Sequence, residues 1–586
     1  MLKLFKNLEK KDWIYISISF AFIVLQVWLE LKIPDYMSKI TELVQLNGGV
    51  KEILVQGAYM LGCALLSFAS SVVVGYIIAN LASNFSKNIR EKLFNKVQSF
   101  SMEEIKKFQT SSLITRTTND IGNVEMMLTL GLQMIIKAPI TAVWAIGKIL
   151  GKSFEWTAIT GGAVLVLLAM VITLMIIVLP RFKIVQKLID SVNGITRENL
   201  KGIRVVRAFN AEKYQEEKFE KTNKKLTNTQ LFNQKVMSIM SPMMYLIMNG
   251  VSLGIYFVGA SLINDALLSE KITLFSNMVV FSSYAMQVIM SFLMLAMIFM
   301  MLPRAQVSAK RINEVMDTKI NIEDGKVTKG KEIGTVEFKN VSFKYPDAEE
   351  CIINNVSFKA NKGETVAFIG STGSGKSTLI NLVPRFYDVT EGEVLVNGVN
   401  VKDYKLESLY NKLGYVPQKA VMFNGTVSSN VSYGKGSKKI TNDKIKEAIK
   451  VAQGKEFVEK LDKKYDSHIA QGGTNVSGGQ KQRLAIARAI ARDPEIYIFD
   501  DSFSALDYKT DSILRKELKK YTKDATSLIV AQRIGTIMNA DKMIVLDNGN
   551  CVGMGTHEEL LKNCEVYKQI ALSQLSKEEL ENGKRK

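Results

Sequence analysis

A glycine-rich loop at residues 370–378 carries the clearest chemistry in the sequence. It reads Gly-Ser-Thr-Gly-Ser-Gly-Lys-Ser-Thr, and Gly370, Gly375, Lys376 and Ser377 match G-x-x-x-x-G-K-[ST] at every fixed position. In such a loop backbone N–H groups point inward at phosphate oxygens, the lysine reaches the β- and γ-phosphates, and the hydroxyl contacts Mg²⁺. The pattern predicts a nucleoside triphosphate site. The alternative is a plain turn between a strand and a helix, and further motifs downstream argue against it.

The elements around this loop are those of an α/β domain. The apolar run 366–369 predicts a buried strand that opens into the loop. The helix that follows would offer its N-terminal amides and its dipole to the same anion. From Thr335 onward no apolar run is long enough to span a membrane, and short strands alternate with helical patterns.

Length, cysteines and charge limit the remaining possibilities. A chain of 586 residues is too long for one core, so we expect several domains. The four cysteines show no paired or metal-ligand spacing and are interpreted as free thiols, and only two histidines argue against a histidine-based metal site. The net charge of +19 would suit a nucleic-acid binder, or basic loops that face the cytoplasm.

Six apolar segments in the first half predict membrane-spanning helices. Each is long enough to cross a hydrocarbon core of ~30 Å, which takes ~20 helical residues. The segment nearest the N-terminus is too long for a signal peptide and has no small-residue cleavage site after it. Lys137 is the one charge inside a segment, and we expect it to snorkel to the inner interface, with contact to an anionic substrate as the alternative. The six segments are residues 13–29, 53–86, 126–147, 156–180, 236–264 and 272–303.

Lysine and arginine set the orientation of these segments. The long connections 87–125 and 181–235 are rich in both, whereas 148–155 and 265–271 are short and hold few. By the positive-inside rule both termini and the two long connections are cytoplasmic, which accounts for part of the positive charge without nucleic acid. The long connections have almost no proline or glycine, so the membrane helices should continue into the cytoplasm.

These patterns divide the chain into four parts. Residues 1–303 form a transmembrane domain, 304–334 a polar linker, 335–575 a soluble α/β domain, and 576–586 a charged tail. The fold class predicted is an α-helical six-span transmembrane domain followed by an α/β P-loop ATPase domain.

The soluble domain resembles the nucleotide-binding domain of ATP-binding cassette (ABC) transporters. Several motifs stand in the order of that family and make the resemblance specific. They are Phe343-Lys-Tyr345, Gly370–Ser377, Val416-Pro-Gln418, Val476-Ser-Gly-Gly-Gln480, Ile496-Tyr-Ile-Phe-Asp-Asp501, Ser504-Ala-Leu-Asp507 and Val530-Ala-Gln532-Arg533.

The first half resembles the membrane domain of the exporter branch. Two pieces of the long connections, 108–120 and 197–210, look like its cytoplasmic coupling helices. One membrane domain with one nucleotide-binding domain makes a half-transporter, so the resemblance implies a dimer. The likeness is greatest to bacterial heterodimeric multidrug exporters.

The resemblance assigns roles to the motif residues. ATP and Mg²⁺ are the implied cofactors, and Asp500, at the end of the apolar run 496–499, would hold Mg²⁺ directly or through water. Gln418 would complete the Mg²⁺ shell, and Tyr345 would stack on adenine. The family signature, Ser477, Gly478, Gly479 and Gln480, would face the ATP of the other subunit. The implied ATP-binding set is Tyr345, Gly370, Ser371, Thr372, Gly373, Ser374, Gly375, Lys376, Ser377, Thr378, Gln418 and Asp500, with Ser377, Gln418 and Asp500 on the metal.

Two positions depart from the family pattern. The family places glutamate after the Mg²⁺ aspartate as general base, and this chain has Asp501, whose side chain is about 1.5 Å shorter. A misplacement of about 1 Å can lower a rate ~10²-fold. The family also places histidine at the switch position, where Gln532 cannot titrate. Both changes, beside an intact signature, suggest one degenerate and one competent site.

The leading hypothesis is therefore one subunit of a heterodimeric ATP-driven exporter in the cell membrane. The expected partners are a second half-transporter subunit, membrane lipid and a small hydrophobic or amphipathic substrate such as a drug, lipid or peptide. The alternative is a homodimeric exporter in which Asp501 suffices as the base. A non-transporting ABC ATPase that acts on nucleic acid or ribosomes is disfavoured by the six spans, and an importer by the fusion of both domains. The sequence does not name the substrate.

Overall fold

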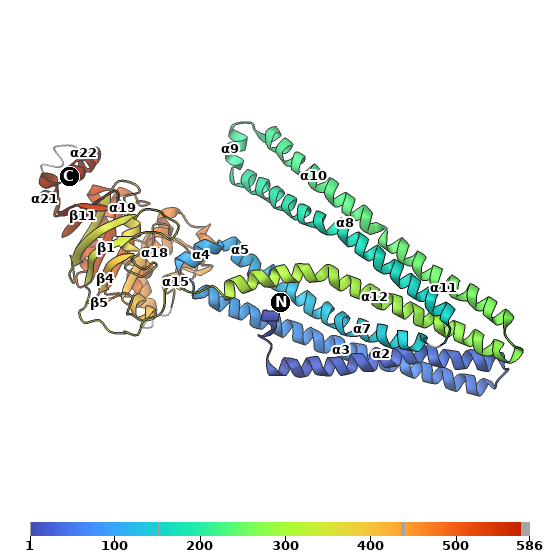
Figure 1. Cartoon of the computed structure of the whole chain (residues 1–586). Coiled ribbons are helices and arrows are strands. Elements are labelled where there is room, and N and C mark those ends of the chain that lie inside the picture. The colour runs from blue at the N-terminus through green and yellow to red at the C-terminus, as the bar shows by residue number, and fades with distance from the viewer. Residues whose placement is uncertain (1, 151, 435–439, 576–586) are drawn as a thin grey trace. The chain divides into compact units, whose positions relative to one another are not determined.

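The computed structural model describes residues 2–150, 152–434 and 440–575 (Figure 1). These residues belong to two compact units, each described by itself below. The helical unit comprises Met1–Gln98 and Thr110–Thr318, and the α/β unit comprises Ser99–Gln109 and Lys319–Lys586. The predicted tail, 576–586, lies outside the described residues.

Long helices build the helical unit. Within the described ranges, six helical stretches are long and apolar enough to cross a membrane, which confirms the predicted spans. Helix α3 has 49 residues, so at ~1.5 Å per residue it is about 70 Å long and exceeds a ~30 Å hydrocarbon core twofold. The helices of this unit are α1 (Leu2–Phe5), α2 (Lys10–Gln45), α3 (Val50–Gln98), α5 (Thr110–Thr115), η1 (Arg116–Asp120), α6 (Ile121–Met126), η2 (Met127–Gly131), α7 (Leu132–Ile149), α8 (Phe154–Lys201), α9 (Ile203–Ala208), α10 (Glu212–Ser238), α11 (Met240–Asp265) and α12 (Leu268–Met316).

Apolar contacts hold these helices together, and in Figure 1 helix α8 runs beside α10 with α9 at the turn between them. The largest cluster of the unit includes Val27 from α2, Val74 from α3, Trp156 from α8 and Phe281 from α12, all without exposed surface. Helix α9 lies within the piece 197–210 that the sequence had singled out.

The helical unit also contains an ion pair within its apolar segments. Lys137 Nζ lies 2.8 Å from Glu30 Oε1, which also accepts from Gln26 Nε2 at 2.9 Å and Ser67 Oγ at 3.4 Å. Lys137 thus pairs with a carboxylate on a neighbouring helix, a partner that the sequence analysis did not name. Glu30 was overlooked because it directly follows the predicted segment 13–29.

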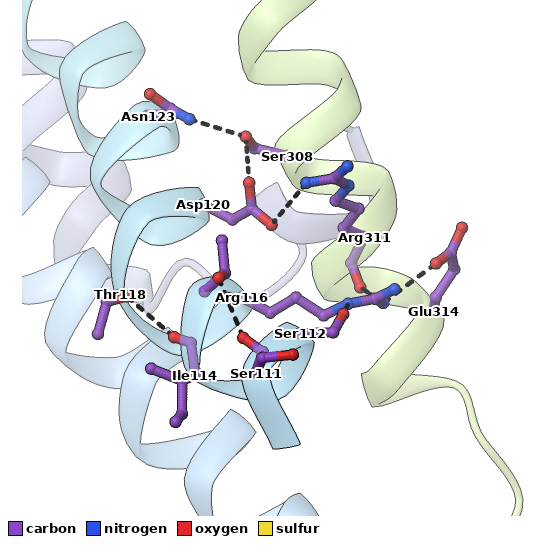
Figure 2. Close-up of polar contacts among 11 residues, drawn as sticks. Ser111, Ser112, Ile114, Arg116, Thr118, Asp120, Asn123, Ser308, Arg311 and Glu314 are labelled. Carbon is purple, nitrogen blue, oxygen red and sulfur yellow. Dashed lines mark hydrogen bonds and ion pairs between the residues drawn. The ribbon is translucent and has the colours of Figure 1, made fainter. Parts of the chain in front are cut away.

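Polar contacts fix the beginning of the third membrane stretch to the end of α12. The buried Asp120 accepts from Ser308 Oγ at 2.7 Å, and Arg116 donates to the Arg311 carbonyl at 2.6 Å and pairs with Glu314 at 3.0 Å (Figure 2). Residues 116–120 and 127–131 are π-helical. Most of the predicted coupling piece 108–120 is thus the start of this stretch.

The separate short helix lies just before it. Helix α4 (Met102–Phe108) begins with Ser101 as N-cap, in a capping box with Glu104, and ends at Gln109, whose φ of +58° breaks the helix. The sequence analysis counted these residues with the transmembrane domain, but they pack as part of the α/β unit. The Ser-x-x-Glu spacing is the local signal for such a helix start.

Two main sheets form the α/β unit. Strands β2 (Ile353–Ala360), β1 (Val336–Phe343), β4 (Glu391–Val396) and β5 (Val399–Asn400) make an antiparallel sheet in that order. The second sheet has the order β12 (Asn550–Gly555), β11 (Lys542–Asp547), β3 (Thr365–Gly370), β10 (Thr526–Val530), β9 (Ile496–Asp500) and β6 (Leu413–Val416), with only β12 antiparallel. A short ladder pairs β7 (Gly425–Thr426) with β8 (His468–Ile469).

Helices pack around the parallel strands (Figure 1). Parallel strands covered on both faces are near-continuous apolar runs, as in Val366–Ile369 and Ile496–Phe499, and all of these residues are buried. The helices are α13 (Lys376–Ile380), α14 (Leu406–Tyr410), α15 (Val427–Val431), α16 (Asn442–Val451), α17 (Lys455–Glu459), η3 (Lys464–Asp466), η4 (Gln471–Gly473), α18 (Gly478–Ala491), α19 (Tyr508–Tyr521), α20 (Ile534–Ile537), α21 (His557–Asn563) and α22 (Glu565–Gln574).

Candidate functional site

The candidate site lies where four neighbouring parallel strands end. Strand β3 ends at Gly370 and β9 at Asp500, while Gln418 and Gln532 each come two residues after the ends of β6 and β10. Since the carboxyl ends of parallel strands share one edge of a sheet, segments far apart in the sequence meet there. The topology therefore brings together the predicted phosphate, metal, base and switch residues.

Backbone conformation explains two of the loop glycines. Gly375 has a φ of +91°, which L side chains rarely adopt, and it directly precedes α13. A Cβ at Gly370 would lie 2.0 Å from the Leu546 carbonyl oxygen, so no larger residue fits against β11. These two positions require glycine for the loop to turn tightly at the end of β3.

Lys376 lies inside the loop. Its Nζ donates to the carbonyls of Gly370 at 2.9 Å and Ser371 at 2.6 Å, and lies 3.2 Å from Ser374 Oγ. Burial lowers the pKa of this ammonium. The loop therefore holds the Lys376 ammonium among its own oxygen atoms. In this position the ammonium can bind an anion that enters the loop.

Ser377 and Asp500 supply two hard oxygen ligands side by side. The Ser377 hydroxyl donates to Asp500 Oδ1 at 2.6 Å, and Asp500 is 5% exposed. Burial, followed by the neighbouring charge of Asp501, raises the pKa of Asp500. No cluster of three or more His, Cys, Asp or Glu side chains with metal-site geometry occurs among the described residues. This donor set fits Mg²⁺ that is bound together with substrate phosphates, as such ions commonly are.

Asp501 accepts hydrogen bonds from both loops that flank it. Its Oδ2 accepts from Gln532 Nε2 at 2.8 Å and from Gln418 Nε2 at 3.3 Å. Its backbone φ is +46°, in the left-handed region that aspartate tolerates better than most residues. Burial raises the pKa of this carboxyl, while the bond from Gln418 opposes the change.

These side chains surround one cavity of about 560 Å³. A volume in the range ~300–1,000 Å³ is typical of a small-molecule site. Its walls include the loop residues from Gly370 to Thr378 except Ser374, together with Gln418, Asp501 and Gln532, and also Ile570 and Gln574 of α22. Sequence reasoning missed the last two, because no motif links the C-terminal helix to the loop.

Tyr345, the predicted adenine platform, lies in an aromatic group beside the loop. Its hydroxyl is hydrogen-bonded to Thr378 Oγ1 at 3.2 Å, and its ring meets Phe343 and Tyr387 edge to face at 5.0 and 5.2 Å. Lys106 of α4 places its Nζ over the Tyr345 ring, 4.6 Å from the centroid. No sequence signal pointed to Lys106 or Tyr387.

The predicted signature residues form a separate helix start. Ser477 caps α18 and is paired with Gln480 in a capping box, with the Ser477 N–H donating to Gln480 Oε1 at 2.9 Å. None of the four residues from 477 to 480 is among the described residues that line the cavity. They present their glycines at another surface of the same unit.

Comparison with known proteins agrees with this geometry. Residues 353–504 match the ABC transporter family, and residues 16–313 match the ABC transporter transmembrane region. The chain belongs to the ABC transporter family.

The similarity to curated relatives extends over nearly the whole length of this ABC transporter chain. The ABC transporter ATP-binding protein YfiB of Bacillus subtilis is 34% identical over 96% of each protein. An uncharacterized ABC transporter ATP-binding protein of Mycobacterium tuberculosis is 36% identical over 93% of each. The ATP-dependent lipid A-core flippase of Haemophilus influenzae is 30% identical over 90% of this chain and 91% of the relative.

A solved structure supports the same fold. A bacterial Atm1-family ABC exporter with ATP bound aligns with a TM-score of 0.80 and 23% identity, over 96% of this chain and 98% of that one. The predicted fold class is confirmed, and the chain is an ABC exporter half-transporter that spans the membrane several times. It binds ATP and couples ATP hydrolysis to transport across the membrane.

Proposed function

We propose that this chain is the degenerate-site subunit of a heterodimeric exporter in the cell membrane, and that it exports hydrophobic or amphipathic compounds. The observation that carries the proposal is the hydrogen bonding of the short Asp501 carboxylate. Gln418 and Gln532 both donate to one oxygen of this short carboxylate. A general base must reach the attacking water. Asp501 is one methylene shorter than glutamate, and the two amides fix the position of its carboxylate, so the shorter reach limits the rate.

Different residues of the site bind different parts of MgATP. Lys376 and the amides of the loop bind the β- and γ-phosphates, and Tyr345 stacks on the adenine. Ser377 and Asp500, already in contact, hold Mg²⁺ with Gln418. The ion, when bound, neutralises charge on the phosphates. Gln532 contributes an amide donor and no titratable imidazole, so it orients groups without accepting a proton.

A second chain is needed for a complete site. The signature residues 477–480 lie away from the chain's own cavity, which suits a head-to-tail pair of nucleotide domains in which each signature covers the partner's ATP. In this arrangement the chain contributes an intact signature to the partner's ATP site, which hydrolyses ATP efficiently. The chain's own site hydrolyses ATP slowly. Both termini and the α/β unit are cytoplasmic, because the long connections carry the lysines and arginines.

Lipid is one class of substrate within this proposal. Two relatives that are 30% and 32% identical over 90% and 87% of this chain are lipid A-core flippases. This similarity keeps an amphipathic lipid among the candidate substrates, with drugs and peptides. Nucleic acid is not among them, since basic loops at the membrane surface account for part of the charge.

The test compares two carboxylate-to-amide changes in the co-purified heterodimer. Asp501→Asn should leave most steady-state ATPase activity, whereas the same change at the partner's equivalent carboxylate should abolish it. The opposite result would reverse the assignment of the two sites. If this chain alone forms a fully active ATPase, the homodimeric alternative, with Asp501 as base, replaces the proposal.

A gain-of-function variant tests the reason for slow turnover. Asp501→Glu restores about 1.5 Å of reach, although the φ of +46° resists the larger side chain. Single-turnover hydrolysis at this site should become faster in Asp501→Glu, and faster again with Gln532→His in the same chain. Equal rates in all three proteins would show that side-chain reach and the missing imidazole are not what limits this site.

A further inference from the structure

Gln574, the last residue of α22, contacts the switch loop through both ends of its carboxamide. Its Oε1 accepts from the Ile534 backbone N–H at 2.9 Å, and its Nε2 donates to the Gln532 carbonyl at 2.8 Å. The two backbone groups lie on either side of Arg533, where the chain leaves β10 and enters α20. One side chain therefore spans the whole switch turn.

The Ile534 N–H that Gln574 contacts is a backbone group that its own helix leaves without a hydrogen-bond partner. The Ile534 N–H is the first of α20, and the N–H groups of a helix's first turn have no acceptor within the helix. The N-cap residue, Arg533, makes no side-chain capping bond. Gln574 thus caps α20 from another helix and, with the same amide, holds the carbonyl of the switch residue.

The contact continues to the candidate base. The side chain of Gln532 donates to Asp501 Oδ2 at 2.8 Å. Gln574 and Ile570, one helical turn apart on α22, also line the cavity that contains Lys376. The C-terminal helix is therefore one wall of the nucleotide site, and its last side chain fixes the backbone from which Gln532 reaches Asp501.

Helix α22 is packed against the core of the α/β unit, so it can hold Gln574 in a fixed position. Tyr567 and Ala571 have no exposed surface. The Tyr567 hydroxyl lies 2.5 Å from His557 Nδ1 and donates to Met543 Sδ of β11 at 3.6 Å. A functional side chain is held best by a rigid element whose other residues are packed in the core.

We propose that Gln574 is a positioning residue of the ATPase site. It fixes the switch turn, so that Gln532 is oriented toward Asp501 and the terminal phosphate. Without Gln574, nucleotide binding by the loop remains, but the switch residue spends less time in its working position. The inference rests on the proposed site, in which Gln532 is the switch and Asp501 the base.

The experiment uses the full-length transporter, with any partner site silenced by changing its base carboxylate to the amide. Gln574→Ala removes both contacts. Gln574→Glu keeps the acceptor for Ile534 and replaces the donor to the Gln532 carbonyl with a repelling oxygen. Gln569→Ala is the matched control, because it deletes the same amide from an exposed position of the same helix. Single-turnover hydrolysis and ATP affinity are measured for each.

We expect Gln574→Ala to lower the hydrolysis rate about five- to tenfold, as expected for one or two lost hydrogen bonds, with ATP affinity changed less than about twofold. Gln574→Glu should be at least as slow, and Gln569→Ala should match the parent. Because Gln574 acts through the switch, the double variant Gln532→Ala/Gln574→Ala should be no slower than Gln532→Ala alone.

Three results would overturn the inference. They are an unchanged rate in Gln574→Ala, equal losses in rate and in ATP affinity, and a double variant whose loss is the product of the two single losses. A parent protein that binds no ATP would instead refute the proposed site itself, so the two failures are distinguishable.

Discussion

Lys106 stands over the ring on which adenine is expected to stack. Its ammonium lies 4.6 Å from the Tyr345 centroid and 5.3 Å from that of Tyr387. The hydrogen bond with Tyr387 raises the pKa of this ammonium, which keeps it charged at neutral pH. A purine that stacks on this face of Tyr345 takes the place of the cation. We therefore predict that Lys106→Ala binds ATP more tightly than the parent protein.

The size of the effect follows from the contact that is removed. A cation–π contact at an exposed site is worth ~0.5–1 kcal/mol, and tenfold in affinity corresponds to ~1.4 kcal/mol, so the expected gain is about two- to fivefold. Inorganic tripolyphosphate carries the charges of ATP but no base, so its affinity should not rise. Lys107→Ala is the control, because it removes the same charge from the next, exposed position of α4.

Calorimetric titration of the full-length protein with both ligands decides the matter. Competition for the ring predicts that only ATP binds more tightly, and only in Lys106→Ala. A similar increase for tripolyphosphate would mean that charge alone is responsible. Weaker ATP binding in Lys106→Ala would show that the ammonium assists the nucleotide, which is the opposite of the reasoning above.

Further predictions concern the loop, the membrane ion pair and the C-terminal helix. Lys376→Ala should weaken ATP binding at least about tenfold, as expected when a charged hydrogen-bond donor to phosphate is lost, and an unchanged Kd would remove the loop from the site. Lys137→Met removes the cation beside Glu30, which keeps its bonds from Gln26 and Ser67, and should destabilise the protein by roughly 1–3 kcal/mol, whereas Glu30→Gln/Lys137→Met should recover most of the thermal stability measured in detergent. Burial lowers the pKa of His557 in the folded state, so its contribution to stability is complete above the ordinary pKa of 6.5 and is lost as the pH falls below it. Denaturant titrations at pH 7 and pH 5 should therefore differ less in His557→Gln than in the parent, and an identical pH dependence would exclude His557 as the cause.

The parts of the fold and of the site that were predicted from sequence depend on residues close together in the chain. Gly373 and Gly375 of the loop have φ values of +88° and +91°, which favour glycine, and the buried strands 366–369 and 496–499 are continuous apolar runs. The six spans followed from length and apolar content alone, which is what membrane insertion itself depends on. These features need no knowledge of distant contacts.

The parts that were missed depend on pairs of residues far apart in the chain. Gln574 contacts residue 532, and Lys106 contacts residue 345, and no motif connects either pair. Lys137 was expected to snorkel because its partner, Glu30, follows the predicted segment and sits on a different helix. The helix boundary inside 108–120 was not predicted, because the backbone break occurs at Gln109, a residue with no strong preference for turns.

Two segments beside the candidate nucleotide site, α22 and α4, are anchored in different ways. At the phosphate end, α22 belongs wholly to the α/β unit and is anchored by buried Tyr567. Beside Tyr345, Lys106 lies on α4, which three residues join to the end of α3 at Gln98 and one residue joins to the start of α5. If adenine stacks on the face of Tyr345 that Lys106 covers, base binding displaces a segment that continues directly into two helices of the helical unit. Coupling between two sites requires such mutually exclusive contacts and is reciprocal, so a rearrangement of those helices that withdraws Lys106 would favour ATP by the same free energy.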